Sequence, residues 1–583
     1  MQTCSPIKIR IPRREGYALL LVIVFTGAAL ILATGIFQYT STTANLNHRH
    51  NEYQRAAAAA EAATEKIVAQ ISTDYRDFGD GYVMRHLDAY RNQVPMAAEH
   101  DGCGDYFFQD LSGRNHRVDI SYFPGSGFEM SSGRYAGLRG TKSKLRVVAN
   151  AKARYSSSSP VGSVYQDIEL LRIPLFQFAI FYNVDLEFDN LPPMTVTGPV
   201  HCNTNIWLDP YSTLTFNSDV TSSGTINESK MADNPLPAGS GAIVYVDPNH
   251  ISGVSTLNLP IGTNTSPAAV HAVIEVPPAL EDPYSSMGQQ RYYNKADLVI
   301  LVRDTNIVAT SGLRNSFATV IPPTQITNFV STNVTFYNKR ELKTIKATQL
   351  DVAKFIQWKA TNTYFSPWLP GQDIGTIYVA DQRTQIASTQ SGVRLVNGQT
   401  LPAGGLTVAT PNPLYTMGHY NAPAGHLGTT NTSATQPASL IADAVTILST
   451  AWTDADSNQS LATRDANNTT VNAAILAGLV RTTSSSYSGG VENFPRFLEE
   501  WTGRTLTYNG SMVAMYYSTI ATNLWRGIGS TYDIYNPPTR DWALDQNYLV
   551  EGKLPPATPS VTVLIRGRWR MPAPYSTNVL AGF

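Results

Sequence analysis

The segment from Tyr17 to Phe37 constrains this chain more than any other, because it contains no charged residue. At about 1.5 Å per residue, a helix of this length covers the roughly 30 Å apolar core of a membrane. Basic residues precede the segment and outweigh the single acid, Glu15. Because positive flanks stay in the cytoplasm, we predict a single-pass anchor with the N-terminus inside and the rest of the chain outside.

The helix is expected to continue well beyond the membrane. The sequence after Gly35 contains no Gly or Pro as far as Phe78, and its second half is rich in Ala, Glu, Lys and Gln, which favour helix. We therefore predict one helix over residues 17–78. Small and aliphatic side chains fall on a narrow face of its outer half, typical of close helix packing. This predicted assembly face includes Ala56, Ala60, Ile67 and Ile71.

Residues 1–78 resemble the N-terminal part of type IV pilins and type II secretion pseudopilins. The resemblance rests on the apolar helix and on a leader motif followed by an aromatic residue, namely Arg13, Arg14, Gly16 and Tyr17. It implies that residues 1–16 are a leader, and that a prepilin peptidase cuts before Tyr17 and methylates the new N-terminus. It also implies that the helix lies in inner-membrane lipid and packs with other pilin-like subunits. A plain, uncleaved anchor with a stalk helix is the alternative.

The fifth residue after the implied cut is Leu21, whereas most members of this family carry Glu there. A carboxylate in lipid is costly, and in the family it offsets the terminal ammonium of a neighbouring subunit. Leu21 cannot form that ion pair. We therefore expect a minor or tip subunit or, alternatively, a leader that is not processed. The resemblance leaves a type IV pilus and a type II secretion system equally open.

Residues 79–175 predict a small pilin-like α/β region. LRVVANAKARY (145–155) and SVYQDIELLRIPLF (163–176) alternate apolar and polar residues on either side of a Ser-rich turn, which is typical of a β-hairpin. By analogy with pilins, we expect this antiparallel sheet to pack on the outer half of the long helix.

The remaining residues, 176–583, predict a mostly β head, so the fold class is α+β. MTVTGPVHCNTNI (194–206) and LTFNSDVTSSGTI (214–226) align with a displacement of twenty residues. Twenty residues suit one coil of a β-solenoid, in which equivalent apolar positions stack. We therefore expect a right-handed β-solenoid (β-helix). The alignment pairs Val196 with Phe216, Val200 with Val220, and Ile206 with Ile226.

Short alternating runs recur after residue 404, and we predict further rungs there, the last at 559–570. Residues 227–404 are less regular and are interpreted as an insertion beside the solenoid. The head resembles large PilX-like pilus-assembly proteins, which implies no chemistry. That resemblance is carried by FAIFYNVDLEF (178–188), GPVHCNTNI (198–206), LTVATPNPLYTMGHYN (406–421), IADAVTILSTAWTDADS (441–457) and YSGGVENFPRFLEEW (487–501). Helical spacing in the last segment predicts a short packed helix with Phe494, Phe497, Leu498 and Trp501 on its buried face and Glu499 off it.

Composition favours an exported, non-enzymatic protein. Charged residues make up 15% of the chain, below the ~25% of average globular proteins. With a net charge of -1 and no basic tract beyond the leader, no nucleic-acid partner is expected. HExxH, GxSxG and phosphate-binding-loop motifs are absent. The rival is a membrane-tethered β-helix carbohydrate-active enzyme or adhesin unrelated to pili, in which acid and base groups would share a cleft: Asp185, Glu187, His201 and Asp219.

Two further sites remain open at the level of sequence. In an oxidising periplasm, Cys103 and Cys202 could form one disulfide or remain two free thiols. A calcium loop would place oxygen ligands at the spacing of Asp454, Asp456, Asn458 and Asp465. A solvated loop is the alternative there; otherwise no cofactor is expected. The predicted location is the inner membrane, with the head in the periplasm or on the cell surface in a filament.

Overall fold

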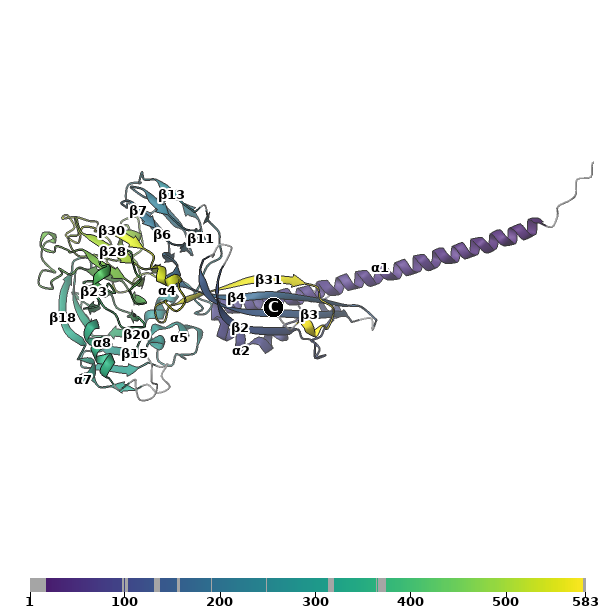
Figure 1. Ribbon diagram of the computed structural model, residues 1–583, viewed down its shortest axis with the longest axis horizontal. Coiled ribbons are helices and arrows are strands. Elements are labelled where there is room, and N and C mark those ends of the chain that lie inside the picture. Colours follow the sequence, from purple (N-terminus) through teal and green to yellow (C-terminus); the bar gives the residue numbers. More distant parts are fainter. Residues whose placement is uncertain are drawn as a thin grey trace, which may run out of the picture.

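In the computed structural model, the helix α1 (Tyr17–Phe78) is continuous and carries a small sheet and a large β head at its outer end (Figure 1). The predicted 17–78 helix is therefore present with these bounds. The leader, including Arg13, Arg14 and Gly16, lies outside the described residues. The structure describes residues 17–96, 99, 103–130, 137–154, 158–189, 191–247, 249–312, 319–362, 364 and 374–579.

The outer half of α1 packs on an antiparallel sheet, as expected by analogy with pilins. The hairpin strands β3 and β4 form the centre of this sheet, and their apolar residues, among them Leu145, Val147 and Ile168, close over Ile67 and Ile71 of the helix. We call α1 from residue 56 onward together with this sheet the module. Its elements are α2 (Asp80–Arg85), α3 (Leu87–Arg91), β1 (Tyr106–Phe108), β2 (Asp119–Glu129), β3 (Arg139–Ala153), β4 (Val161–Pro174) and β31 (Ser560–Arg570).

The strand β31 corrects one prediction. Residues 559–570 were expected to form a rung of the head, but β31 pairs antiparallel with β4 at the edge of the module. The head is thus inserted between β4 and β31, and two chain segments cross into it. A strand that alternates apolar and polar residues fits the antiparallel sheet of the module as well as a parallel sheet of the head, so the pattern alone did not distinguish the two.

The first part of the head is a stack of three-sided coils with parallel strands. The predicted pairs Val196 with Phe216, Val200 with Val220, and Ile206 with Ile226 are all observed as ladder partners. The twenty-residue displacement is therefore confirmed. The strands of the three sides are, in order, β5 (Ile180–Tyr182), β8 (Val200–Cys202), β11 (Val220–Ser222) and β14 (His250–Ile251); β6 (Leu186–Asp189), β9 (Ile206–Asp209) and β12 (Ile226–Asn227); and β7 (Met194–Val196), β10 (Leu214–Phe216) and β13 (Ile243–Tyr245).

A second parallel stack joins the first end to end, because β5 pairs with a strand more than 300 residues away in sequence, β29. One long sheet runs on from there, and at its far end β16 and β17 pair antiparallel. Its strands are β29 (Met512–Ala514), β27 (Ala474–Ala477), β24 (Ala438–Ala442), β22 (Leu406–Ala409), β20 (Thr376–Asp381), β15 (Leu298–Val302), β16 (Ile307–Ser311) and β17 (Val320–Ile321).

Other faces of the second stack are formed by two shorter sheets. The first contains β18 (Val330–Asn338), β19 (Lys343–Asp351), β21 (Thr389–Val396), β23 (Leu414–Met417) and β25 (Val445–Leu448), and the second contains β26 (Thr469–Asn472), β28 (Thr505–Asn509) and β30 (Thr539–Ala543). The short helices of the head are α4 (Pro267–His271), α5 (Ser286–Gln290), α6 (Tyr292–Lys295), α7 (Pro323–Ile326) and α8 (Val352–Thr361).

Two predictions about the head were wrong. Residues 227–404 are not simply an insertion beside the stack, since β15 and β20 lie in its long sheet and β20 pairs in parallel with β22. The segment YSGGVENFPRFLEEW does not form the expected α-helix. Only Val491–Asn493 make a short 3-10 turn, and Arg496 then pairs in parallel with Thr446. Glu499, predicted to lie off the buried face, is fully buried and accepts from Ser449. The apolar side chains are buried as predicted: Phe494, Phe497, Leu498 and Trp501.

Candidate functional site

The inner half of α1 is an apolar surface that no other described part of the chain covers. Phe25, Ile31 and Phe37 are 65%, 75% and 76% exposed, and Leu21 is 56% exposed. Among the described residues, α1 is the helix long and apolar enough to cross a membrane. Burying a large apolar side chain is worth about 1.5–3 kcal/mol, so this surface requires lipid or other helices.

One face of the outer half of α1 is covered by the chain itself, which corrects the predicted assembly face. Ala56, Ala60, Ile67 and Ile71 are all 0% exposed because the sheet of the same chain covers them. The small residues of this face allow α1 to approach the strand β4 closely. A Cβ placed on Gly162 of β4 would lie 2.2 Å from the backbone nitrogen of Ala57. The surface available to other helices therefore comprises residues 17–55 and the opposite face of the outer half, where Ala58, Ala62 and Ala69 are exposed.

The head is fastened to the module by hydrogen bonds at several points. The side chain of buried Gln177 accepts from the backbone nitrogen of Arg139 at 2.7 Å and donates to its carbonyl at 2.6 Å. Gly262 in the head donates to the carbonyl of Asp77, near the end of α1, at 2.7 Å. These contacts couple the position of the head to that of α1.

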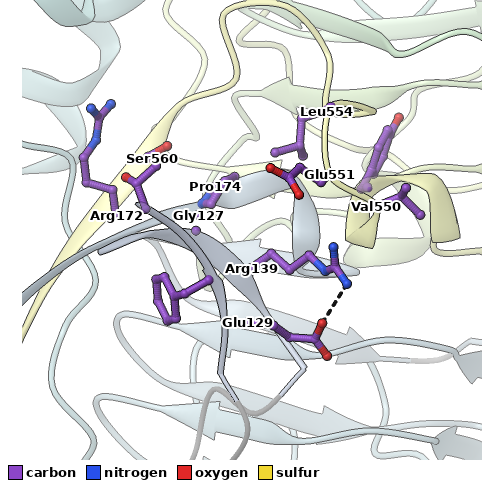
Figure 2. Close-up of a pocket in the computed structure, with 14 residues that line it drawn as sticks. Gly127, Glu129, Arg139, Arg172, Pro174, Val550, Glu551, Leu554 and Ser560 are labelled. Carbon is purple, nitrogen blue, oxygen red and sulfur yellow. Dashed lines mark hydrogen bonds and ion pairs between the residues drawn. The ribbon is translucent and has the colours of Figure 1, made fainter. Parts of the chain in front are cut away.

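A cavity of about 500 Å³ lies at this junction (Figure 2). Its walls come from β2, β3 and β4 on the module side and from residues 548–554 and Ser560 where the chain leaves the head. Arg139 donates to Glu129 at 2.7 Å, and Figure 2 shows Glu551 reaching in from the head side. The pocket is thus shared by module and head, and its walls would move apart if the head turned on α1.

Cys202 is a free, buried thiol rather than half of a disulfide. Its sulfur lies 3.3 Å from the carbonyl oxygen of Val184, and burial raises the pKa of the thiol to about 12. The side chain of Cys103 lies outside the described residues. Of the two alternatives, the free thiol holds for Cys202.

Of the residues named for a carbohydrate-cleaving site, Asp185 and Glu187 line one small cavity, whereas His201 and Asp219 are not among its lining residues. His201 is fully buried, with Nδ1 2.9 Å from the Thr221 hydroxyl and Nε2 3.0 Å from the Asn203 side-chain oxygen. Glu187 is also buried and accepts from Thr482 at 2.9 Å; burial raises its pKa to about 7. Asp185 instead accepts from the backbone of Asn205, and Asp219 lies half-buried before β11. The hydrogen bonds of His201, Asp185 and Glu187 tie neighbouring segments of the head together.

The residues predicted to bind calcium also interact with other groups instead of with a common site. The carboxylate of Asp454 accepts two hydrogen bonds from Arg394, at 2.5 and 3.0 Å, and so is already neutralised. Asp456 accepts from the Thr453 hydroxyl, while Asp465 forms a backbone bridge with Glu500. Over the described ranges, no group of three or more His, Cys, Asp or Glu side chains is placed to hold a metal ion.

One cluster of buried polar side chains was not predicted from the sequence. His271 is nearly buried, with Nδ1 2.8 Å from the Glu275 carboxylate and Nε2 3.4 Å from Asp443 and 3.1 Å from the Thr519 hydroxyl. Burial opposes the charge, but the carboxylates outweigh it and raise the pKa of His271. Only the spacing of His271 and Glu275 could have hinted at this cluster, because Asp443 lies 172 residues away.

This arrangement superficially matches a hydroxyl, imidazole and carboxylate relay, but the His271 ring lies between two carboxylates, which raise its pKa and so oppose its use as a base. The backbone nitrogens of Thr519 and Ala521, which could otherwise bind an oxyanion, donate to the Asp443 carboxylate at 2.5 and 2.7 Å. We therefore assign the cluster to tertiary structure, where it ties α4 to the loop after β29.

Comparison with solved structures gives similarity to the crystal structure of the competence-associated pilin ComZ from Thermus thermophilus. The sequence identity is 10% and the TM-score 0.27, with 89% of this chain and 98% of that chain covered. No family model and no curated protein matches the chain. At this TM-score the likeness carries no functional argument, so function is inferred from the geometry of the chain itself.

Proposed function

We propose that this chain is a membrane-anchored, pilin-like subunit, placed as a minor or tip component of a type IV pilus or type II secretion-like filament. One observation carries the proposal: a single helix exposes an apolar half and buries its other half in a small antiparallel sheet of the same chain. Such a helix can lie in lipid before assembly and among other helices after it.

The division of α1 at about residue 55 supports this role. Because the sheet covers one face of the outer half, neighbouring subunits would contact mainly residues 17–55 and would leave the head outside the helix bundle. Leu21 lacks the carboxylate of most family members, and a head of this size would crowd identical neighbours, so few copies per filament are expected. Other pilin-like subunits and the prepilin peptidase are the proposed partners.

The head is proposed to be a right-handed β-solenoid that primes assembly, adheres to a surface or contacts exported cargo. Its parallel ladders and stacked apolar positions support this class. We further propose that the head is not an enzyme and needs no cofactor, in keeping with the hydrogen bonds that Asp185 and Glu187 accept from Asn205 and Thr482. The chain would reside in the inner membrane with its head in the periplasm.

Filament incorporation tests this proposal. Cells making a tagged chain are sheared, and the released filaments are purified and probed for the tag. The parent chain should co-purify in substoichiometric amount, whereas Gly16→Asp, which removes the glycine before the proposed cut, should remain in the membrane. Gly81→Ala, which adds a methyl group in α2 with its nearest neighbour 3.9 Å away, is the matched control. A parent chain absent from every filament fraction and found only in membranes would favour a tethered protein unrelated to pili.

A further inference from the structure

A small cavity lies where the two stacks of the head meet. Its walls come from the ends of β5 and β6 in the first stack, from residues 478–480 after β27 in the second stack, from the turn between β18 and β19, and from residues 488–496. The cavity measures about 10 Å³, which is room for one water molecule or one ion of similar size. A ligand in this cavity would therefore contact several segments that are far apart in the sequence.

A buried cation lines this cavity. Arg340 is 3% exposed, and it forms an ion pair with no carboxylate of the described residues. The carboxylate next to it in sequence, Glu341, pairs instead with Arg496, with 3.1 Å between Oε1 and Nη1. Burial and, after it, the charge of Arg496 lower the pKa of Arg340 to about 9, and Glu341 offsets only part of this shift. The guanidinium is still charged at neutral pH, and a buried charge is costly unless an opposite charge compensates it.

Two hydrogen-bond donors of the cavity wall lack an acceptor. The Nε–H of Arg340 and the hydroxyl of Tyr182 are both buried and have no hydrogen-bond partner among the described residues. Both side chains line the cavity. Tyr182 is 2% exposed, and burial raises the pKa of its hydroxyl, so the group stays protonated and available as a donor. Since buried donors are rarely left unsatisfied in folded proteins, both groups favour an acceptor inside the cavity.

The two acidic residues of the wall do not supply this acceptor. Asp185 accepts from the backbone nitrogen of Asn205 at 3.2 Å, and Glu187 accepts from the Thr482 hydroxyl at 2.9 Å. Neither forms an ion pair with Arg340. Burial raises the pKa of Glu187 to about 7, so this carboxyl carries only part of a charge at neutral pH. The acids therefore leave the buried guanidinium uncompensated and oppose a small anion beside it only weakly.

We propose that this cavity binds a single chloride ion, which accepts hydrogen bonds from Arg340 and Tyr182 and compensates the buried charge. The small volume excludes carboxylate, phosphate and sulfate. A water molecule would accept the same hydrogen bonds but would leave the guanidinium without an opposite charge. The ion would link β5 of the first stack to the turn between β18 and β19 and so stabilise the joint between the stacks. This site does not depend on incorporation into a filament.

Thermal unfolding of the full chain in detergent tests the proposal. Sodium gluconate is replaced stepwise by sodium chloride at constant ionic strength, and the melting temperature is followed as chloride rises. The parent should gain stability in a saturable manner, because a ligand that binds only the folded state stabilises it. Bromide, a monatomic anion of similar size, should reproduce the gain.

The variant Tyr182→Phe removes only a hydroxyl that has no partner among the described residues. It should raise the chloride concentration at half-maximal stabilisation by at least roughly tenfold, because a hydrogen bond to a charged group usually changes binding by such a factor. Tyr420→Phe is the matched control, since the Tyr420 hydroxyl is also buried without a described partner and its side chain is not among those that line the cavity. It should leave that concentration unchanged.

Crystals grown in bromide provide the second measurement, and they should show an anomalous peak beside Arg340 and Tyr182. A melting temperature of the parent that does not depend on chloride would overturn the proposal and leave a water molecule in the cavity. Equal chloride dependence of Tyr182→Phe and Tyr420→Phe would also overturn it, because the ion would then bind elsewhere. Anomalous peaks confined to other places would mark an adventitious ion only and would count against the site in the same way.

Discussion

Replacing Gly162 with alanine should weaken the packing of α1 on its sheet. The new Cβ would lie 2.2 Å from the backbone nitrogen of Ala57 and 2.4 Å from the carbonyl carbon of Ala56. Favourable contacts between such atoms lie near 3.5 Å or beyond, so the helix or β4 must shift by about 1 Å. Since both obstacles are backbone, no side-chain rotation relieves them. We expect the upper end of the usual overpacking cost, about 3 kcal/mol.

Hydrogen exchange measured by mass spectrometry reads this cost locally, without assuming that module and head unfold together. A loss of about 3 kcal/mol in the free energy of opening should accelerate exchange of the α1 peptide covering residues 56–68 by roughly 100-fold. Gly81→Ala, where the added methyl group has room, should leave that peptide protected. If Gly162→Ala leaves the exchange of this peptide unchanged, the close packing of α1 on β4 is refuted.

Other predictions concern buried polar groups. Asp167→Ala should lower the free energy of unfolding by about 3 kcal/mol, because it removes the carboxylate that pairs with the nearly buried guanidinium of Arg146. Glu65→Ala removes an exposed ion pair and should lower it by less than about 1 kcal/mol. Denaturant titration compares the two variants. Burial raises the pKa of Glu492 from 4.5 to about 8, so the folded head loses stability as the pH rises between these values. Glu492→Gln should therefore raise the melting temperature at pH 8 and leave it unchanged at pH 4.5, and equal effects at both pH values would contradict this assignment. Cys202 should resist alkylation in the native protein and react after unfolding, as followed on its own peptide; rapid native labelling would show that the thiol is accessible.

The sequence revealed features that leave a local or evenly spaced trace. An uncharged apolar run followed by strong helix formers predicted α1 to its last residue. Stacked coils repeat their apolar positions at a fixed interval, so the pairing of Val200 with Val220 could be read directly from the alignment. Both features follow from the spacing or composition of residues along the chain, which can be recognised without knowledge of the tertiary structure.

Features decided by a distant partner could not be predicted. The small face around Ala56 and Ala60 suits another helix or a strand bearing Gly162, and only the fold selects between them. Phe494, Phe497 and Trp501 have helical spacing, yet parallel pairing of Arg496 with the coil keeps the chain extended. His271 and Asp443 meet from segments that share no local pattern.

The central claim is that this chain enters a filament as a processed, pilin-like subunit, and the mass of its N-terminal peptide tests that claim most directly. The protein is extracted from membranes and from filaments, digested and analysed by mass spectrometry. We predict a peptide that begins at Tyr17 and carries one additional methyl group. An intact N-terminus at Met1 in both fractions would contradict the claim and leave a simple anchor with a stalk.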